Sequence, residues 1–242
     1  MWSATMGAMK VWSIVVAAGL GSRFGGFKQV ESLGDDRIVV DWAVGSAEAV
    51  SDGVVLVVAT ALVDSLKTRY PAPDVHVVEG ADSRSGSVRA GLAVVPDDAQ
   101  IVVVHDGARP LAEAKLFGRV IAAVRDGAAG AITAVPVTDT IRTVDGSPVD
   151  RENLRAVQTP QAFWANALRE AHAAGHDATD DASLVEANGG RVVVVDGDRM
   201  NIKITEFEDL IAARAVLESR VPPEMAPQPA SETATDPEAV NG

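Results

Sequence analysis

The sequence predicts an α/β fold with a doubly wound, mainly parallel sheet and a projecting β-arm. Three observations lead to this fold class. Short runs rich in Val and Ile alternate with segments of helical length, as in a parallel sheet with crossover helices. A glycine-rich turn directly follows the first apolar run, at residues 17–21. Asp145-Gly146 is a hairpin signal near 141–150 that interrupts the alternation and predicts an arm projecting from the sheet.

The predicted strands are short apolar runs bounded by Gly, Pro, Asp or Thr. The run at 101–105 is the clearest, since Asp106 and Gly107 end it at once. The Ile-Arg-Thr-Val alternation after position 140 is typical of a strand with one solvent-exposed face. We expect strands at 11–17, 54–59, 75–79, 101–105, 131–137, 191–195 and 201–204, with the hairpin at 141–149.

The predicted helices lie between these runs and begin or end at recognisable signals. Ser83 is a candidate N-cap, and Pro71 and Pro73 end the helix that follows the second strand. We expect helices at 39–50, between 60 and 70, and at 83–95, 115–125, 161–174, 181–187 and 206–220.

Three segments are expected along the chain. Residues 1–9 form a loose leader, and 10–220 form one domain, a size that 242 residues allow. Residues 221–242 are rich in Pro and acidic residues, with no basic residue and little to bury, so a disordered tail is expected there.

Composition excludes several classes of function. There is no cysteine, which excludes disulfides, zinc-thiolate sites and thiol nucleophiles and is compatible with the cytoplasm, where we expect the protein. The net charge of −13 argues against non-specific nucleic-acid binding. No apolar run has the ~20 residues of a membrane span, so no membrane association is expected. Lys10 with the apolar run 11–18 resembles a short signal peptide, but the run continues into the glycine-rich loop, as a first strand would.

The glycine-rich loop is a candidate phosphate site. Ligands of open α/β sheets bind beyond the carboxyl ends of the strands, and glycines let backbone N–H groups approach a phosphate. Gly19 and Gly21 lack the lysine of a Walker loop and the third glycine of a dinucleotide fingerprint, where Phe24 stands. Arg23 and Lys28 follow closely and are candidates to clamp a polyphosphate, although two solvated surface charges would give the same pattern.

Other candidate residues follow later strands. Asp106 ends the strand at 101–105 and is placed to hold Mg²⁺ against phosphates, with Arg109 three residues on. Lys203 lies between two isoleucines and either faces a polar site or the solvent side of a strand. Thr179 precedes two aspartates that form either a helix cap or an acidic turn. His172 and His176 are four residues apart but lack the context of a metal motif.

Five separated segments together resemble the 2-C-methyl-D-erythritol 4-phosphate cytidylyltransferase family of the non-mevalonate isoprenoid pathway. The resemblance spans about residues 11–215. The segments, in order, are AAGLGSR at 17–23 with KQ at 28–29, VHDGARP at 104–110, PVTDTIR at 136–142, QTPQAF at 158–163, and TDDASLVE at 179–186 with NIKIT at 201–205.

The resemblance implies a Rossmann-like nucleotidyltransferase sheet and a homodimer whose arms, each over about 138–158, exchange. It implies that Arg23, Lys28 and Lys203 are catalytic and grip the phosphates of CTP. The nucleotide would lie against Ala17, Ala18, Gly19, Gly21, Gly80, Ala81, Asp82 and Ser87. Asp106 would bind Mg²⁺, the expected cofactor. The small phosphorylated polyol would contact Asp106, Arg109, Thr140, Arg151, Thr159 and Thr179, with Thr140 and Arg151 serving the neighbouring subunit.

The chain departs from the family pattern in the first loop and leaves alternatives open. The family usually has Pro-Lys-Gln in a longer loop, whereas here Phe27 precedes Lys28 and about two residues are missing; Ala81 stands where glycine is frequent. Within the same chemistry, ribitol 5-phosphate is an alternative acceptor, and a sugar 1-phosphate or another base is a more distant one. A nucleotide-binding module without catalysis and a Rossmann oxidoreductase are alternatives of other classes.

Overall fold

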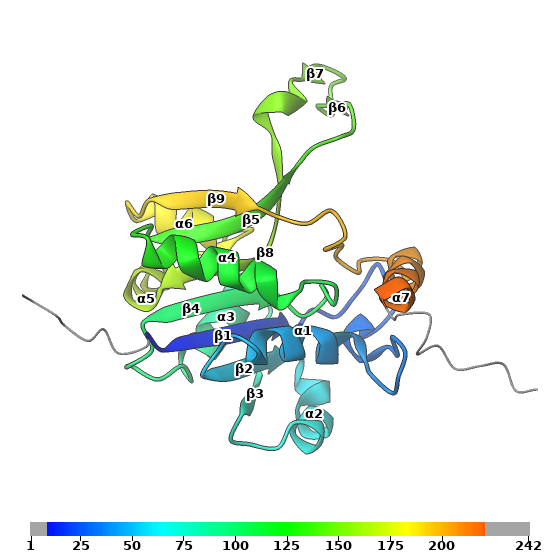
Figure 1. The fold of residues 1–242 in the computed structure, drawn as a ribbon, viewed down its shortest axis with the longest axis vertical. Coiled ribbons are helices and arrows are strands. Elements are labelled where there is room, and N and C mark those ends of the chain that lie inside the picture. Colours follow the sequence, from blue (N-terminus) through cyan, green and yellow to red (C-terminus); the bar gives the residue numbers. More distant parts are fainter. Residues whose placement is uncertain (1–8, 221–242) are drawn as a thin grey trace, which may run out of the picture.

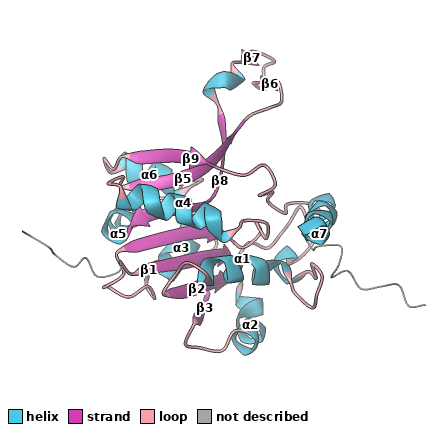
Figure 2. Cartoon of the chain, viewed as in Figure 1, coloured by secondary structure: helices cyan, strands magenta, loops and turns pink. Residues whose placement is uncertain are grey.

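The computed structural model describes residues 9–220, which form a twisted sheet with helices on both faces and one projecting arm (Figures 1 and 2). Residues 1–8 of the expected leader and the expected tail, 221–242, lie outside the described residues. The strands are β1 (Val11–Ala17), β2 (Gly53–Val58), β3 (Val75–Glu79), β4 (Ile101–Asp106), β5 (Gly130–Pro136), β6 (Ile141–Arg142), β7 (Pro148–Val149), β8 (Arg155–Trp164) and β9 (Val192–Asp196). The helices are α1 (Val39–Glu48), α2 (Val63–Arg69), α3 (Arg84–Leu92), α4 (Ala114–Arg125), α5 (Ala165–Ala173), α6 (Asp181–Ala187) and α7 (Phe207–Arg220), with short 3₁₀ turns η1 (Lys28–Val30), η2 (Thr60–Leu62) and η3 (Arg151–Asn153).

The main sheet has the strand order β3-β2-β1-β4-β8-β5-β9. Strands β1 to β4 pair in parallel, and β9 pairs in parallel with β5. Strand β8 runs antiparallel to both of its neighbours, β4 and β5. The predicted fold class, a mainly parallel doubly wound sheet, is confirmed.

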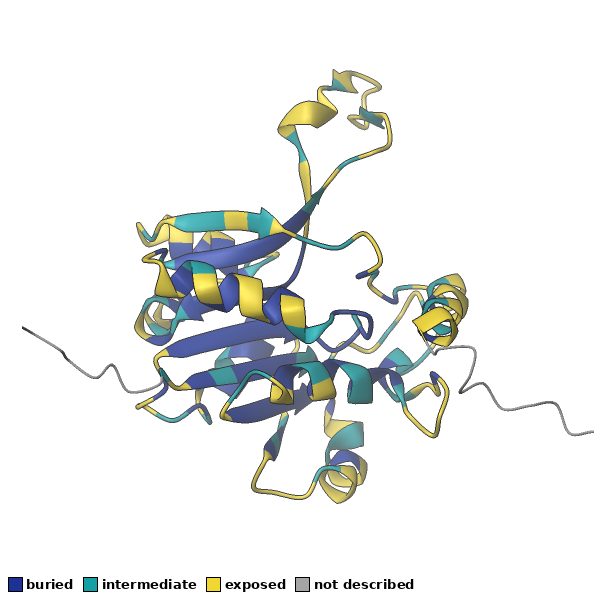
Figure 3. Ribbon diagram, viewed as in Figure 1, coloured by how far each residue is buried: buried dark blue, intermediate teal, exposed yellow. Residues whose placement is uncertain are grey.

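Two apolar cores cover the two faces of the sheet, and Figure 3 shows its central strands largely as buried and its edge strand β9 as partly exposed. On one face α1, α2 and α4 pack against β1, β2 and β4, around the buried Phe117. On the other face α3, α5 and α6 pack around Phe163 and Leu168. Strands β2 and β4 are buried along their whole length, which explains why they read as unbroken apolar runs.

A third cluster joins helix α7 to the edge where the parallel strands end. Leu210 and Ala213 of α7 are buried against Leu33, Leu111 and Ile204. Asp209 also accepts the backbone N–H groups of residues 205 and 206 through Oδ2, at 2.8 and 2.9 Å. Helix α7 therefore anchors the segment that leads up to it, including position 203.

Two predicted elements are wrong. The helix expected at 161–174 begins at Ala165, because residues 155–164 form β8, and Pro160 is tolerated where the β5–β8 register shifts. The strand expected at 201–204 is an irregular segment. No ladder holds it; instead Ile204 N–H donates to the Ala108 carbonyl at 2.8 Å and the Asn201 side chain donates to the Thr159 carbonyl at 2.8 Å.

The arm leaves the sheet between β5 and β8 and carries the small β6–β7 sheet at its tip (Figure 1). Its register pairs Ile141 with Val149, which confirms the expected hairpin, and Gly146 has the positive φ, +88°, that favours glycine in such a turn. Val144 at the tip is fully exposed.

Candidate active site

A cavity of about 630 Å³ lies beyond the carboxyl ends of β1 to β4. Its walls come from the glycine-rich loop, the loop before α3, the end of β4 and the segment before α7. The lining includes Ala18, Gly19, Gly21, Arg23, Lys28, Gly80, Ala81, Asp82, Arg84, Ser87, Asp106 and Lys203. This is the edge at which ligands bind in open α/β sheets.

The glycine-rich loop is closed on itself by Gly21. The Gly21 carbonyl accepts the N–H groups of Phe24 and Gly25, both at 2.9 Å. Gly21 has φ +64°, and a Cβ there would lie 2.0 Å from the Gly26 carbonyl oxygen. The turn therefore requires glycine at this position. The Gln29 side chain donates to the Gly19 carbonyl at 2.7 Å and ties the loop to η1.

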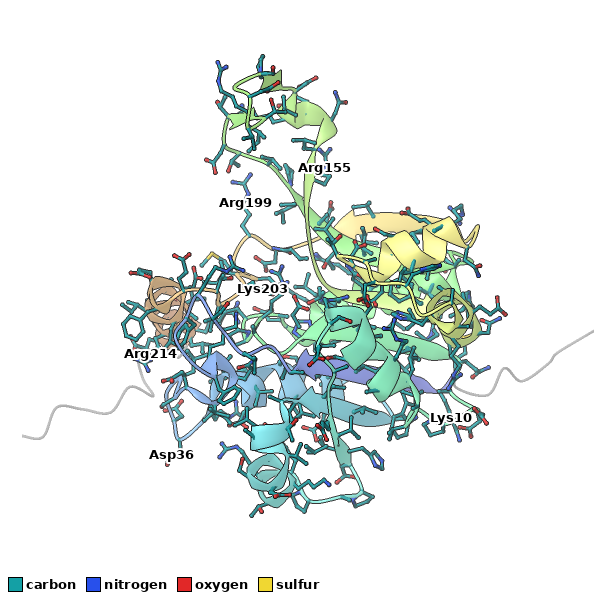
Figure 4. The ribbon with its side chains drawn as sticks, turned by 180° about the vertical axis from the view of Figure 1, so that it is seen from behind. Lys10, Asp36, Arg155, Arg199, Lys203 and Arg214 are labelled. Atoms are coloured by element: carbon teal, nitrogen blue, oxygen red, sulfur yellow. The ribbon has the colours of Figure 1, made fainter. Side chains whose placement is uncertain are left out.

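Three cations approach the cavity together. Burial lowers the pKa of Lys28, and the charges of Lys203 and Arg23 lower it further. Arg23, Lys28 and Lys203 all line the cavity. Figure 4 shows Lys203 on the segment between the sheet and α7. These cations repel one another, and an anionic ligand such as a polyphosphate would relieve that repulsion.

The opposite wall is the loop between β3 and α3. Ser83 caps α3 by accepting the Gly86 N–H at 3.0 Å. Ser87 accepts the Ala81 N–H at 3.1 Å and donates to the Ser83 carbonyl at 3.0 Å, so it fixes the loop from within. A Cβ at Gly80 would lie 2.4 Å from the Cβ of Ala18, which shows how closely the two loops approach.

Asp106 is the acidic centre of the site. Its Oδ2 lies 2.7 Å from Lys203 Nζ and 3.6 Å from Arg109 Nε, and its Oδ1 lies 3.6 Å from Arg84 Nε. Burial alone would raise the pKa of Asp106, but the charges of Lys203, Arg84 and Arg109 outweigh it and hold that pKa well below its ordinary range. The carboxylate is therefore ionised throughout the working pH range.

The ligands around Asp106 suit Mg²⁺ held mainly by water and phosphate better than a metal whose ligands all come from the protein. Residues 9–220 contain no cluster of three or more His, Cys, Asp or Glu that would hold an ion by themselves. Mg²⁺ takes one or two carboxylates and completes its shell with water and phosphate oxygens. One buried carboxylate beside a cavity lined by Arg23, Lys28 and Lys203 suits that mode of binding.

A second, smaller cavity of about 280 Å³ adjoins the first. Arg84, Asp106 and Lys203 line both cavities, so these three side chains form the boundary between them. The remaining lining is Arg109, Val157, Gln158, Thr159, Gln161, Thr179 and Asp180. The arrangement suits two anionic ligands that meet at one point.

A buried hydrogen-bond chain sets the position of Thr159. The Asp106 N–H donates to Thr159 Oγ1 at 2.9 Å, and Thr159 Oγ1 lies 3.1 Å from His105 Nδ1. His105 Nε2 lies 3.2 Å from the Arg109 carbonyl. Because a carbonyl accepts, Nε2 carries the proton, and Nδ1 then accepts from the Thr159 hydroxyl. Burial lowers the pKa of His105 to about 4, which keeps the ring neutral.

Because burial lowers the pKa of His105, we expect the folded protein to lose stability as the pH falls. Between pH 6.5 and about 4 the unfolded chain takes up a proton at His105 that the folded chain does not. The free energy of unfolding should fall over that window, by up to about 3 kcal/mol from this group. Urea unfolding at pH 7, 6, 5 and 4.5 measures it, with His105→Asn as the control. The same pH slope in both proteins would contradict the prediction.

Known proteins resemble this chain over most of its length. The family model for 2-C-methyl-D-erythritol 4-phosphate cytidylyltransferase matches residues 11–219. The chain belongs to this family. A relative of that name from Rhodococcus opacus is 45% identical over 218 residues, 86% of this chain and 95% of the relative. One from Nocardia farcinica is 42% identical over 221 residues, 87% of this chain and 95% of the relative.

Solved structures of cytidylyltransferases share the fold. The 4-diphosphocytidyl-2C-methyl-D-erythritol synthase of Anaerococcus prevotii superposes with a TM-score of 0.76 at 29% identity, covering 87% of this chain and 96% of that one. The 2-C-methyl-D-erythritol 4-phosphate cytidylyltransferase of Thermus thermophilus gives a TM-score of 0.73 at 31% identity, covering 87% and 100%.

Within this cytidylyltransferase, most of the residues expected at the site lie at the two cavities. Of the expected nucleotide-side residues, Ala17 is the buried end of β1 and does not line the large cavity, whereas Ala18 next to it does. Arg109, Thr159 and Thr179 meet at the small cavity. Arg109 is held there by a 2.8 Å bond from Nη1 to the Asn201 carbonyl.

Thr140 and Arg151 do not reach the cavities of their own chain. Both lie in the arm, outside the lining of either cavity, and Arg151 donates to the Thr138 carbonyl within the arm.

Sequence reasoning missed Arg84. It is the first residue of α3 and bonds Asp181 Oδ2 through Nη1 at 2.8 Å while its Nε faces Asp106. The available signal was its place directly after the capping Ser83, in a loop already expected to bind nucleotide. Asp181 lies 97 positions away, and no local pattern pairs the two residues.

Proposed function

We propose that this chain transfers a cytidylyl group from CTP to 2-C-methyl-D-erythritol 4-phosphate. The products are pyrophosphate and 4-diphosphocytidyl-2-C-methyl-D-erythritol, a precursor in isoprenoid biosynthesis. The observation that carries the proposal is the boundary of the two cavities, where Lys203, Arg84 and Asp106 line both. Membership of the family and relatives of that name across the chain's length support the acceptor.

The reaction asks the residues to bring two anions together. A phosphate oxygen of the acceptor attacks the α-phosphorus of CTP in line, a new P–O bond forms, and the bond to pyrophosphate breaks. Arg23 and Lys28 would bind the leaving pyrophosphate side, and Lys203 would bind the α-phosphate at the boundary. Positioned donors of this kind stabilise charge that develops on phosphoryl oxygens.

Asp106 would hold the Mg²⁺ ion. When bound, the ion would neutralise phosphate charge and help to order the triphosphate. The buried carboxylate, kept ionised by its cationic neighbours, is the group of this chain that supports magnesium as the cofactor.

The acceptor would occupy the small cavity. Arg109 offers a cation, and Thr159 and Thr179 offer hydroxyl groups to a phosphorylated polyol. Thr140 and Arg151 would complete the site from the arm of a second subunit, since in their own chain they lie away from it. The exposed, projecting arm supports a homodimer with arm exchange. Residues 9–220 contain no helix long and apolar enough to span a membrane. A cytoplasmic location, where CTP is made, is part of the proposal.

Pyrophosphate release tests the proposal. The protein is supplied with CTP and Mg²⁺, and methylerythritol 4-phosphate and ribitol 5-phosphate are compared as acceptors in parallel. Turnover with the first acceptor, lost on addition of a chelator, is expected. Turnover with ribitol 5-phosphate alone would retain the chemistry and overturn the acceptor. CTP binding without release of pyrophosphate from either would favour a module that binds nucleotide without catalysis.

A further inference from the structure

A row of three buried or half-buried polar side chains leads from helix α5 to the boundary between the cavities. His172 of α5 is 3% exposed, and its Nε2 lies 3.0 Å from Asp181 Oδ1. Asp181 of α6 is fully buried, and its Oδ2 accepts from Arg84 Nη1 at 2.8 Å. Arg84 Nε then faces Asp106 Oδ1 at 3.6 Å. This row of side chains therefore links α5, α6, α3 and β4.

Packing of the fold alone does not explain this row. A buried carboxylate with two charged or polar partners is seldom more stabilising than well-packed apolar side chains of the same size. Residues around it in the same core, such as Leu168 and Val185, are apolar. A buried ion pair is best explained by what it holds in place, and here it holds a guanidinium at the wall of both cavities.

The guanidinium of Arg84 has donors left over for a ligand. Nη1 is directed at Asp181, and Nε faces Asp106 at a distance longer than a hydrogen bond. Among residues 9–220 no protein acceptor is bonded to Nη2. Burial would lower the pKa of Arg84, but the charges of Asp181 and Asp106 outweigh it and raise that pKa, so the group stays cationic.

The loops around Arg84 are joined at the same place. Ser85 Oγ accepts the Ala178 N–H at 3.1 Å, and Ser83 Oγ donates to Asp177 Oδ1 at 2.8 Å. The start of α3, which borders the large cavity, is thus fixed to the segment that carries Thr179 into the small cavity. A shift of Arg84 would disturb both sides together.

We propose that Arg84 binds phosphate oxygens of both substrates at the cavity boundary, and that Asp181 and His172 are positioning residues that act through Arg84. The inference rests on the proposed cytidylyl transfer and adds residues to it. A planar guanidinium held from behind by a carboxylate presents its remaining N–H groups in a fixed direction, which a flexible lysine would not do.

A double-mutant cycle on the full chain tests the coupling. Arg84→Lys keeps the charge, but one ammonium group cannot bond Asp181 and reach a ligand as the fork does. Asp181→Asn keeps the shape and weakens the hold on Arg84. Each single change is expected to lower kcat about tenfold or more. The double variant should match the slower single variant within about twofold, because both changes break the same row.

His172 supplies a pair of variants that separates positioning from packing. His172→Gln keeps an N–H donor for Asp181 and is expected to retain kcat within about twofold, whereas His172→Leu should lose about tenfold. Thermal melting of every variant checks that the protein is folded at the assay temperature. The matched control is Asp98→Asn, an exposed surface aspartate that pairs with Lys10 and lines neither cavity, and it should retain wild-type kcat.

Three results would overturn the inference: losses of Arg84→Lys and Asp181→Asn that multiply, an Arg84→Lys protein with wild-type kcat, or equal effects of the two His172 changes. Turnover of the wild-type protein in the same assay tests the proposed function separately. Calorimetric titration of CTP with Mg²⁺ into the same variants measures the coupling without any acceptor. There the same non-additive pattern in affinity is expected, and multiplying losses of affinity would also overturn the inference.

Discussion

Replacement of Lys203 by alanine is expected to lower kcat by about 10²–10³, with a much smaller change in the affinity for CTP. Lys203 lines both cavities and touches Asp106 at 2.7 Å, so its ammonium stands where the two substrates meet. Charge that builds up on the α-phosphoryl oxygens in the transition state would lose a donor there. Arg23 and Lys28 would still bind the triphosphate of CTP in the ground state.

The fold should survive this change, which makes the kinetic result interpretable. Asp106 keeps Arg84 and Arg109 as cationic neighbours, and Lys203 is 43% exposed, so no buried charge is left alone. Steady-state kinetics and calorimetric CTP binding measure the effect, and Lys115→Ala, on the exposed surface of α4, is the matched control. If Lys203→Ala turned over at a near-native rate, the role assigned to Lys203 would be wrong.

Mixing two inactive variants is expected to restore activity if the arm serves the neighbouring subunit. Arg151→Ala damages the arm and Lys203→Ala damages the cavity, and each alone should lose most of its turnover. When the two are unfolded and refolded together at equal amounts, about half of the dimers are mixed. Each mixed dimer has one site with an intact cavity and an intact arm. About a quarter of wild-type activity should return.

The physical basis is that Thr140 and Arg151 of the arm lie outside the lining of both cavities of their own chain. Arg151 donates to Thr138 inside the arm. If the arm served its own site, mixing would restore no activity, because every site would then contain either Arg151→Ala or Lys203→Ala. The control mixes Arg151→Ala with Thr140→Ala, two arm variants that should not rescue each other to the same extent.

Most of the elements could be predicted from the sequence, and most of the residues expected at the site line the two cavities. Fully buried parallel strands such as β2 and β4 must be apolar throughout, and helices need signals such as the Ser83 cap, so both are local in the chain. Because the carboxyl ends of parallel strands share one edge, the predicted strands already placed the glycine-rich loop and Asp106 together.

Strand order and the antiparallel β8 could not be predicted in this way. Residues 155–164 contain a proline and lead directly into a helix, so their local pattern does not distinguish a strand from the start of that helix. Their place between β4 and β5 depends on pairing with both neighbours. The register shift in the β5–β8 ladder, where Ile132 pairs with Gln161 and Thr133 with Gln158, leaves Thr159 free to contact Asp106.

The sequence by itself determined the chemistry available to this protein: a glycine turn that requires Gly21, cations at Arg23, Lys28 and Lys203, and a carboxylate at the end of β4. The tertiary structure decided which of these groups meet. It brought Arg84 to Asp106 and to Asp181, 97 positions away, and it separated the arm from its own cavities. The physical reason is that residue type and spacing fix local geometry, whereas the contacts between distant side chains depend on how the whole sheet packs.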